Sequence, residues 1–203
     1  LFIVLLTGIF TGLVMAYQSI YAFSLFGAET LVGGAVAISL ARELAPVLTA
    51  LMVAGRTGSS MTTELGTMRV TEQIDAMAVM AVNPIQYLVT PRIVASVLMM
   101  PILTMLFNFV GIVAAYVISV YAINVDPGIF VHKIQDFVDR QDLLFSALKG
   151  ACFGAVISVV GCYKGFYASG GAKGVGNATT SSVVTSSVSV LLMDYILTIL
   201  MWR

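Results

Sequence analysis

The sequence predicts an all-α integral membrane protein with five transmembrane helices. Of its 203 residues, 59% are hydrophobic and only 10% are charged, whereas about a quarter of the residues in a soluble domain are charged. The mean hydropathy is +1.00. A membrane-spanning helix needs roughly 20 apolar residues, and the chain offers five such runs within one predicted transmembrane domain over residues 1–203. The runs cover residues 1–26, 31–54, 88–123, 143–166 and 179–202.

The first and third runs have features of their own. The first begins at Leu1, which is not an initiator methionine, so we expect a preceding segment to be missing from the sequence. The third is longer than one crossing requires and contains Pro91 and Pro101, so tilt, a kink or an interfacial first turn would absorb the surplus. Glycine pairs at GxxxG spacing predict close helix packing: Gly8 and Gly12, Gly150 and Gly154, Gly161 and Gly165.

Between the second and third runs, residues 62–84 mix charged and apolar side chains at helical spacing. Thr62 and Thr63 are the predicted N-terminal caps, and Asn83 with Pro84 is the predicted end. Two interpretations stay open, namely a helix that docks a partner and a solvated connector that skims the interface. The apolar stripe is Leu65, Met68, Ile74, Met77, Ala78 and Ala81.

The distribution of basic residues places this segment in the cytoplasm. Five basic residues lie in the loops after the second and fourth runs and three lie on the opposite side, where four aspartates dilute them. An odd number of spans then puts the C-terminus outside the cell. The first group is Arg56, Arg69, Arg92, Lys164 and Lys173, and the second is Lys133, Arg140 and Arg203.

Two charged residues, Arg42 and Glu43, interrupt the second run near its middle. Each costs on the order of 2.5–3.5 kcal/mol at that depth, so their presence needs a reason. Pro46 follows and predicts a kink, because its ring would clash with the carbonyl of Arg42. Three interpretations stay open: a polar point in a substrate cavity, a buried charge network with Asp194 or Lys149, and a proton relay.

The last run carries another intramembrane carboxylate, Asp194, which needs a partner, a proton or access to the headgroups. Other candidates point to no chemistry. The loop at 169–176 lacks the P-loop pattern, one histidine makes no metal site, and Cys152 and Cys162 are expected to be buried spectator thiols. A net charge of zero gives no argument for nucleic acid. The sequence contains neither an HExxH nor a GxSxG motif, so no catalytic motif indicates an enzyme.

The block at residues 42–92, RELAPVLTALMVAGRTGSSMTTELGTMRVTEQIDAMAVMAVNPIQYLVTPR, closely resembles the signature region of the MlaE/YrbE permease family. The similarity continues through MPILT at 100–104, GGAKGVGNATTSSVV at 170–184 and MDYILT at 193–198. It covers almost the whole chain.

The resemblance implies the permease subunit of an ABC-type phospholipid transporter that works as a homodimer. The family fold has five transmembrane helices after an interfacial helix. Implied partners are a cytoplasmic ABC ATPase dimer, in many systems a small STAS-domain protein, and an external MCE-domain hexamer. Such a chain has no cofactor and is no enzyme, since ATP and Mg belong to the ATPase. The implied location is a bacterial inner membrane, with a plastid envelope as the other membrane of this family.

The resemblance also assigns site residues. Residues 64–82 would form a coupling helix in a groove of the ATPase, and Arg42 and Glu43 would lie in the lipid cavity. Tyr17, Leu40 and Leu44 are added as apolar wall from their position alone. The coupling contacts would be Glu64, Met68, Arg69, Glu72 and Asp75.

The rival hypothesis is an ion-coupled secondary transporter that uses Arg42, Glu43 and Asp194. The sequence shows no inverted repeat, which is evidence against it. Transport in liposomes without any ATPase would favour it.

Overall fold

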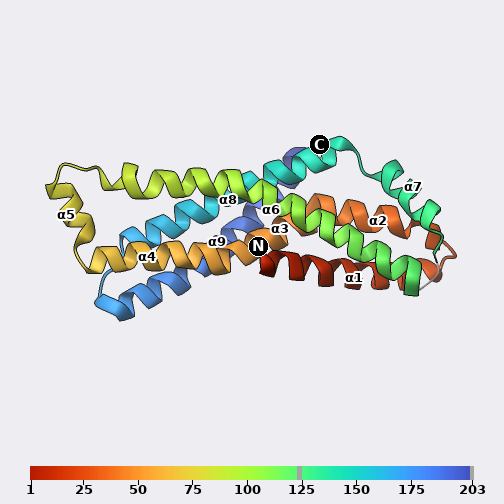
Figure 1. Cartoon of the computed structure of the whole chain (residues 1–203), viewed down its shortest axis with the longest axis horizontal. Coiled ribbons are helices and arrows are strands. Elements are labelled where there is room, and N and C mark those ends of the chain that lie inside the picture. Colours follow the sequence, from red (N-terminus) through yellow and green to blue (C-terminus); the bar gives the residue numbers. More distant parts are fainter. Residues whose placement is uncertain (123–124, 202–203) are drawn as a thin grey trace. The chain divides into compact units, whose positions relative to one another are not determined.

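A computed structural model describes residues 1–122 and 125–201, and all regular structure in this part of the chain is helical (Figure 1). Five helical runs are long and apolar enough to cross a membrane: Phe2–Ser24, Val32–Val70, Ile85–Tyr121, Arg140–Phe166 and Gly171–Met201. The prediction of an all-α membrane protein with five spans is confirmed. Ile123, Trp202 and Arg203, which entered the predicted spans and loops, lie outside the described residues.

The chain forms two compact units. Unit 1 contains Leu1–Thr49 and Pro101–Leu148, and unit 2 contains Ala50–Met100 and Lys149–Arg203. Each unit therefore combines segments that are far apart in the sequence.

In unit 1, α1 makes a close contact with α6. The α1 residues Gly8, Gly12 and Ala16 are all buried. A side-chain carbon at Gly12 would collide with the carbonyl group of Gly111, so only glycine allows this approach. The helices of this unit are α1 (Phe2–Ser24), η1 (Glu29–Leu31), α2 (Val32–Ser39), η2 (Leu40–Leu44), η5 (Ile118–Ala122) and α7 (Pro127–Phe137), with parts of α3 (Ala45–Val53), α6 (Thr90–Val117) and α8 (Arg140–Phe166).

The short helix α7 in unit 1 is capped and anchored by its own residues. Asp126 accepts the backbone N–H groups of Gly128 at 2.8 Å and Ile129 at 3.0 Å, as an N-cap does. Phe130 is 1% exposed, and its ring meets that of Tyr116 edge-on at 5.7 Å. The segment after the third span is therefore a packed helix.

In unit 2, α4 packs against both α9 and α8. A side-chain carbon at Gly165 of α8 would lie 2.8 Å from the Thr62 carbonyl oxygen and 2.8 Å from Leu65 Cβ. The predicted glycine pair thus marks a close helix contact within the chain. The helices of this unit are η3 (Ala54–Gly58), α4 (Ser59–Val70), α5 (Gln73–Val79), η4 (Ile85–Val89) and α9 (Gly171–Met201), with parts of α3, α6 and α8.

The predicted capping role of Thr62 and Thr63 is wrong, because the second helical run continues to Val70. Thr62 is fully buried inside the helix. Its hydroxyl lies 2.9 Å from the Gly58 carbonyl oxygen and 3.0 Å from that of Gly161. Short hydroxyl side chains satisfy themselves on the carbonyl four residues back, so this polar stretch stays helical without a new start.

Candidate functional site

The segment predicted as one coupling helix over residues 64–82 is divided into two helices. After α4 ends at Val70, Glu72 adopts φ of +61°, and α5 runs only from Gln73 to Val79. A left-handed residue cannot continue a right-handed helix, so the chain changes direction there. In Figure 1, α5 crosses between the end of α4 and the segment that leads into α6. The prediction of one continuous helix is therefore wrong.

An ion pair spans this break. Arg69 Nη1 on α4 lies 2.6 Å from Asp75 Oδ1 on α5. Both side chains are more than a third exposed, so the pair contributes little stability but favours one orientation of α5. Two of the predicted ATPase contacts are thus engaged with each other.

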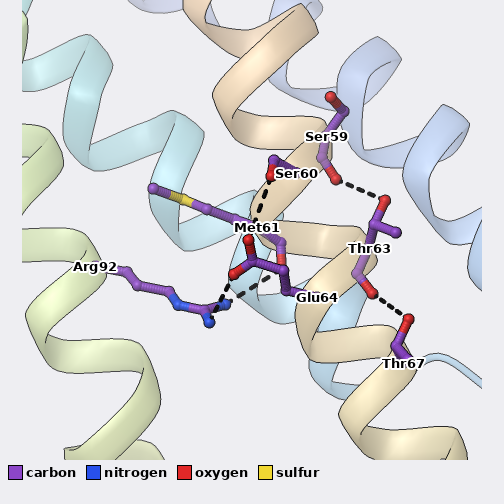
Figure 2. A network of polar contacts seen from close by, with 7 residues as sticks. All are labelled: Ser59, Ser60, Met61, Thr63, Glu64, Thr67 and Arg92. Atoms are coloured by element: carbon purple, nitrogen blue, oxygen red, sulfur yellow. Dashed lines mark hydrogen bonds and ion pairs between the residues drawn. The ribbon is translucent and has the colours of Figure 1, made fainter.

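A second polar network joins α4 to α6 (Figure 2). Arg92 Nη2 donates to Glu64 Oε2 at 3.0 Å, and Nη1 donates to the Met61 carbonyl oxygen at 3.4 Å. Figure 2 shows the Arg92 side chain reaching from α6 across to α4, where Ser60 also donates to Glu64 at 3.4 Å. Glu64 therefore ties two helices together within the chain.

Beside this network, the hydroxyl groups of α4 bond along their own helix. Figure 2 shows Thr63 donating to the Ser59 carbonyl and Thr67 donating to the Thr63 carbonyl, at 2.9 and 2.8 Å. Each bond satisfies a hydroxyl on the carbonyl four residues back along the helix. The Thr63 hydroxyl also lies 3.0 Å from that of Thr179 on α9.

The apolar stripe of the predicted helix turns toward the core of unit 2. Leu65 and Ile74 are buried in one cluster with Leu88 and Cys162, and Met68 and Met77 pack against it. Part of the Met68 side chain is therefore already covered by other residues of this chain. The exposed residues of this segment include Glu72, just before α5, and Val79 and Met80 at its end, which are 88% and 68% exposed.

The predicted end of this segment also differs. Asn83 does not terminate α5, which already ends at Val79. Its Oδ1 accepts the backbone N–H groups of Ile85 at 3.1 Å and Gln86 at 3.4 Å. Asn83 thus satisfies the first N–H groups of the third membrane run, which begins at Ile85, earlier than predicted.

The charged pair of the second run lies in a π-helical turn, η2. The N–H of Ala45 bonds to the Leu40 carbonyl, one residue further back than in an α-helix. Pro46 has no N–H to offer the carbonyl of Arg42, and a wider turn accommodates its ring. The irregularity predicted at this proline is a π turn.

Arg42 is paired with an aspartate from another helix. Its Nε lies 3.0 Å from Asp142 Oδ1, and the Asp142 side chain is only 2% exposed. Asp142 stands in the first turn of α8, and its Oδ2 accepts the N–H of Asp139 at 3.0 Å. Neither Asp194 nor Lys149, which the sequence analysis considered as partners, makes this bond.

The other predicted cavity residues have different environments within unit 1. Glu43 and Leu44 are half-buried, and Tyr17 on α1 is 63% exposed. Leu40 is fully buried, and its side chain lies against Gly111. Their assignment to a cavity wall stays a prediction.

The carboxylate of the last span has the partner that its depth requires. Asp194 Oδ1 lies 3.0 Å from Lys149 Nζ, which also donates to Thr198 Oγ1 at 2.8 Å. The Lys149 side chain is 1% exposed. A buried ion pair between α8 and α9 thus compensates both charges.

No group of three or more His, Cys, Asp or Glu side chains in residues 1–122 and 125–201 is arranged to hold a metal ion. His132 instead lies 3.1 Å from Asp136 on the same helix.

Sequence reasoning missed two of these side chains. Asp142 is one of the four aspartates that the sequence analysis counted on the external side for their charge alone. It stands three residues after Asp139 and just before an apolar run, which is the spacing of a capping box. Arg92 was counted only for its charge, and nothing local indicates that it pairs with Glu64.

Five membrane-spanning helices, two ion pairs that each bury at least one charged side chain, and the absence of any strand in the described residues define a polytopic membrane protein. The family model described as permease MlaE matches residues 1–200. The chain belongs to this family of membrane permeases.

Curated relatives agree with this assignment. A probable ABC transporter permease of Synechocystis sp. is 46% identical over 203 residues, which cover 99% of this chain and 76% of that protein. One from Rickettsia conorii is 41% identical over 201 residues, 99% of this chain and 78% of the relative. The intermembrane phospholipid transport system permease protein MlaE of Haemophilus influenzae is 39% identical over 203 residues, 100% of this chain and 78% of the relative.

Proposed function

We propose that this chain is the permease subunit of an ABC transporter that moves phospholipid between the inner membrane and an external ring of MCE-domain proteins. A partner ATPase drives the movement. The observation that carries the proposal is the family match across residues 1–200. The name of the Haemophilus influenzae relative supports phospholipid as the cargo.

The proposed assembly contains two copies of this chain and a cytoplasmic ABC ATPase dimer, with a STAS-domain protein as a further subunit. The predicted orientation puts α5 in the cytoplasm and the C-terminus on the periplasmic side. ATP and Mg bind to the ATPase in this assembly, so the permease performs no chemistry.

We assign the ATPase contact to Glu72, which precedes α5, to α5 itself and to the turn that follows it. Glu72 offers an exposed charge, while Val79 and Met80 offer apolar surface at 88% and 68% exposure. Exposed apolar side chains beside a charge are typical of a contact centre. Glu64, Arg69 and Asp75 then act indirectly, because their internal ion pairs fix α5 and α4.

The proposed cycle follows from this arrangement. ATP binding closes the ATPase dimer and moves α5, and the Arg92 to Glu64 ion pair carries the motion between α4 and α6. The predicted lipid cavity around Arg42 and Glu43 then changes its volume or access. Replacing Glu43 by Ala should alter the lipid content of the purified transporter more than its assembly.

The experiment is co-expression with the proteins encoded by neighbouring genes and purification of this chain, followed by mass spectrometry of the bound proteins and lipids. The Glu72→Lys variant should lose ATPase while keeping its membrane insertion. Lys173→Glu reverses an exposed charge elsewhere in unit 2 and serves as the matched control. Normal ATPase recovery with Glu72→Lys would contradict the contact assignment, and recovery of no ATPase with the unaltered chain would contradict the function.

The ion-coupled alternative would use Arg42, Glu43 and Asp194. Arg42 is paired with Asp142 and Asp194 with Lys149, so neither charge depends on a coupling ion for compensation. Lipid transport by the chain alone, in liposomes with an ion gradient and no ATPase, would nevertheless favour this alternative.

A further inference from the structure

Unit 2 contains a groove whose lining includes none of Glu72, Val79 and Met80. Its volume is about 240 Å³, and it runs between the start of the third membrane run and the last turns of α8. Its walls are apolar and aromatic. Ile85, Val89 and Ile93 line one side, and Cys162, Tyr163 and Phe166 line the other.

Tyrosines form the outer edge of this groove. Tyr163 and Tyr167 are 61% and 69% exposed, and their ring centroids lie 5.0 Å apart. Tyrosine has an apolar ring and a polar hydroxyl, which is why it gathers where a membrane meets water. The groove therefore lies beside residues suited to the level of lipid headgroups.

The surroundings of a membrane-spanning helix decide what fills such a groove. Water needs two to four polar partners to occupy a cavity, and these walls offer few. An empty groove would lose dispersion contacts along its whole lining. Hydrocarbon chains of the bilayer surround both helices and meet neither penalty.

We propose that the groove binds one acyl chain of a phospholipid as a resident lipid, with its headgroup beside Tyr163 and Tyr167. This lipid is distinct from the transported lipid assigned to the region of Arg42 and Glu43. The inference requires only that the chain spans a membrane, so it stands whether or not an ATPase binds α5.

The bound acyl chain would also stabilise the packing of α5. Cys162 belongs to the buried cluster that includes Ile74 of α5, and Val89 and Phe166 pack against that cluster. The same three side chains line the groove. An acyl chain in the groove therefore contacts the same residues that pack around Ile74 of α5.

Tryptophan quenching tests the site in the full chain. With Trp202→Phe removing the single native tryptophan, Val159→Trp places an indole in the groove. Val94→Trp is the matched control, since Val94 and Val159 are 52% and 50% exposed and Val94 is not among the groove's lining residues. Both proteins are placed in nanodiscs with increasing fractions of phospholipid brominated on its acyl chains.

We expect the Val159→Trp signal to reach half-quenching at a lower brominated fraction than the control. Adding Ile93→Phe, which fills the groove, should move that curve back to the control curve. Coinciding curves without the filling substitution would overturn the proposal. If Val159→Trp does not fold, Ile85→Trp reports from the opposite wall and carries the same expectation.

Amide hydrogen exchange tests the support given to α5. Removing lipid with detergent should speed exchange at Ile74 through Val79 more than at the buried α1 residues Gly8 through Ala16. Equal acceleration in both segments would show that the lipid does not support α5.

Discussion

Asp142 Oδ1 lies 3.0 Å from Nε of Arg42, a residue 100 positions earlier in the chain. The other oxygen of the same carboxylate accepts the Asp139 N–H at the start of α8. One buried side chain therefore caps a helix and holds the guanidinium of the π-helical turn in place. Arg42, which is proposed to line the lipid cavity, is thus held in place by Asp142, a side chain expected to lie in a loop.

Replacing Arg42 should destabilise the protein more than replacing Asp142. Arg42→Gln leaves the Asp142 carboxylate buried without its guanidinium, and breaking a buried pair this way costs about 3–5 kcal/mol. Asp142→Asn should cost about 1–2 kcal/mol, because the Arg42 side chain is 37% exposed and is partly solvated. Thermal unfolding in detergent measures both. Equal losses of stability would contradict the assignment of Asp142 as the buried partner.

The pair between Lys149 and Asp194 predicts rescue by a second substitution. Lys149→Met leaves the Asp194 carboxylate without its amine and should destabilise unit 2 by about 3 kcal/mol. Lys149→Met with Asp194→Leu should regain much of that loss, since neither charge then remains buried. Unfolding in SDS titrations gives the comparison, with Lys173→Met as an exposed control. A double variant as unstable as the single one would argue against the pair.

The close contact of α8 with α4 predicts a position-specific effect of alanine. Gly165→Ala would place Cβ 2.8 Å from the Thr62 carbonyl oxygen, and overpacking of this kind costs about 1–3 kcal/mol. Gly176→Ala meets nothing within 4 Å and should stabilise the helix by about 0.5–1 kcal/mol. Thermal unfolding of both variants is the test. Loss of stability at both positions would point to a general requirement for glycine.

Asp136 on α7 predicts a titration below the usual aspartate range. A hydrogen bond from Lys133 is the main cause that lowers its pKa from the ordinary 3.8, with His132 adding to it. A lowered pKa in the folded state means that the carboxylate supports α7 above the ordinary value and loses this effect as the pH falls through the folded value. NMR titration of Asp136 in the intact chain measures this pKa. Lys133→Met should raise it, and an unchanged titration would exclude the Lys133 contact as the cause.

The sequence by itself determined the five spans and the family. Long apolar runs have one stable solution in a bilayer, since helices satisfy every backbone hydrogen bond internally. The requirement that Asp194 have a partner also followed from the sequence, because an isolated carboxylate at that depth is too costly. Both inferences depend on properties of a single segment.

Only the tertiary structure decided which residues meet. The pairing of Arg42 with Asp142, and of Glu64 with Arg92, depends on helices that are distant in sequence and come together on folding. The break at Glu72 carries no glycine signal, so the left-handed conformation was hidden from sequence reasoning. Glu64 and Met68 are four residues apart on α4, and both are engaged within unit 2 because α6 and α8 pack around α4. Local pattern fixes a helix and its apolar side, whereas the neighbours of each side chain depend on packing between distant segments.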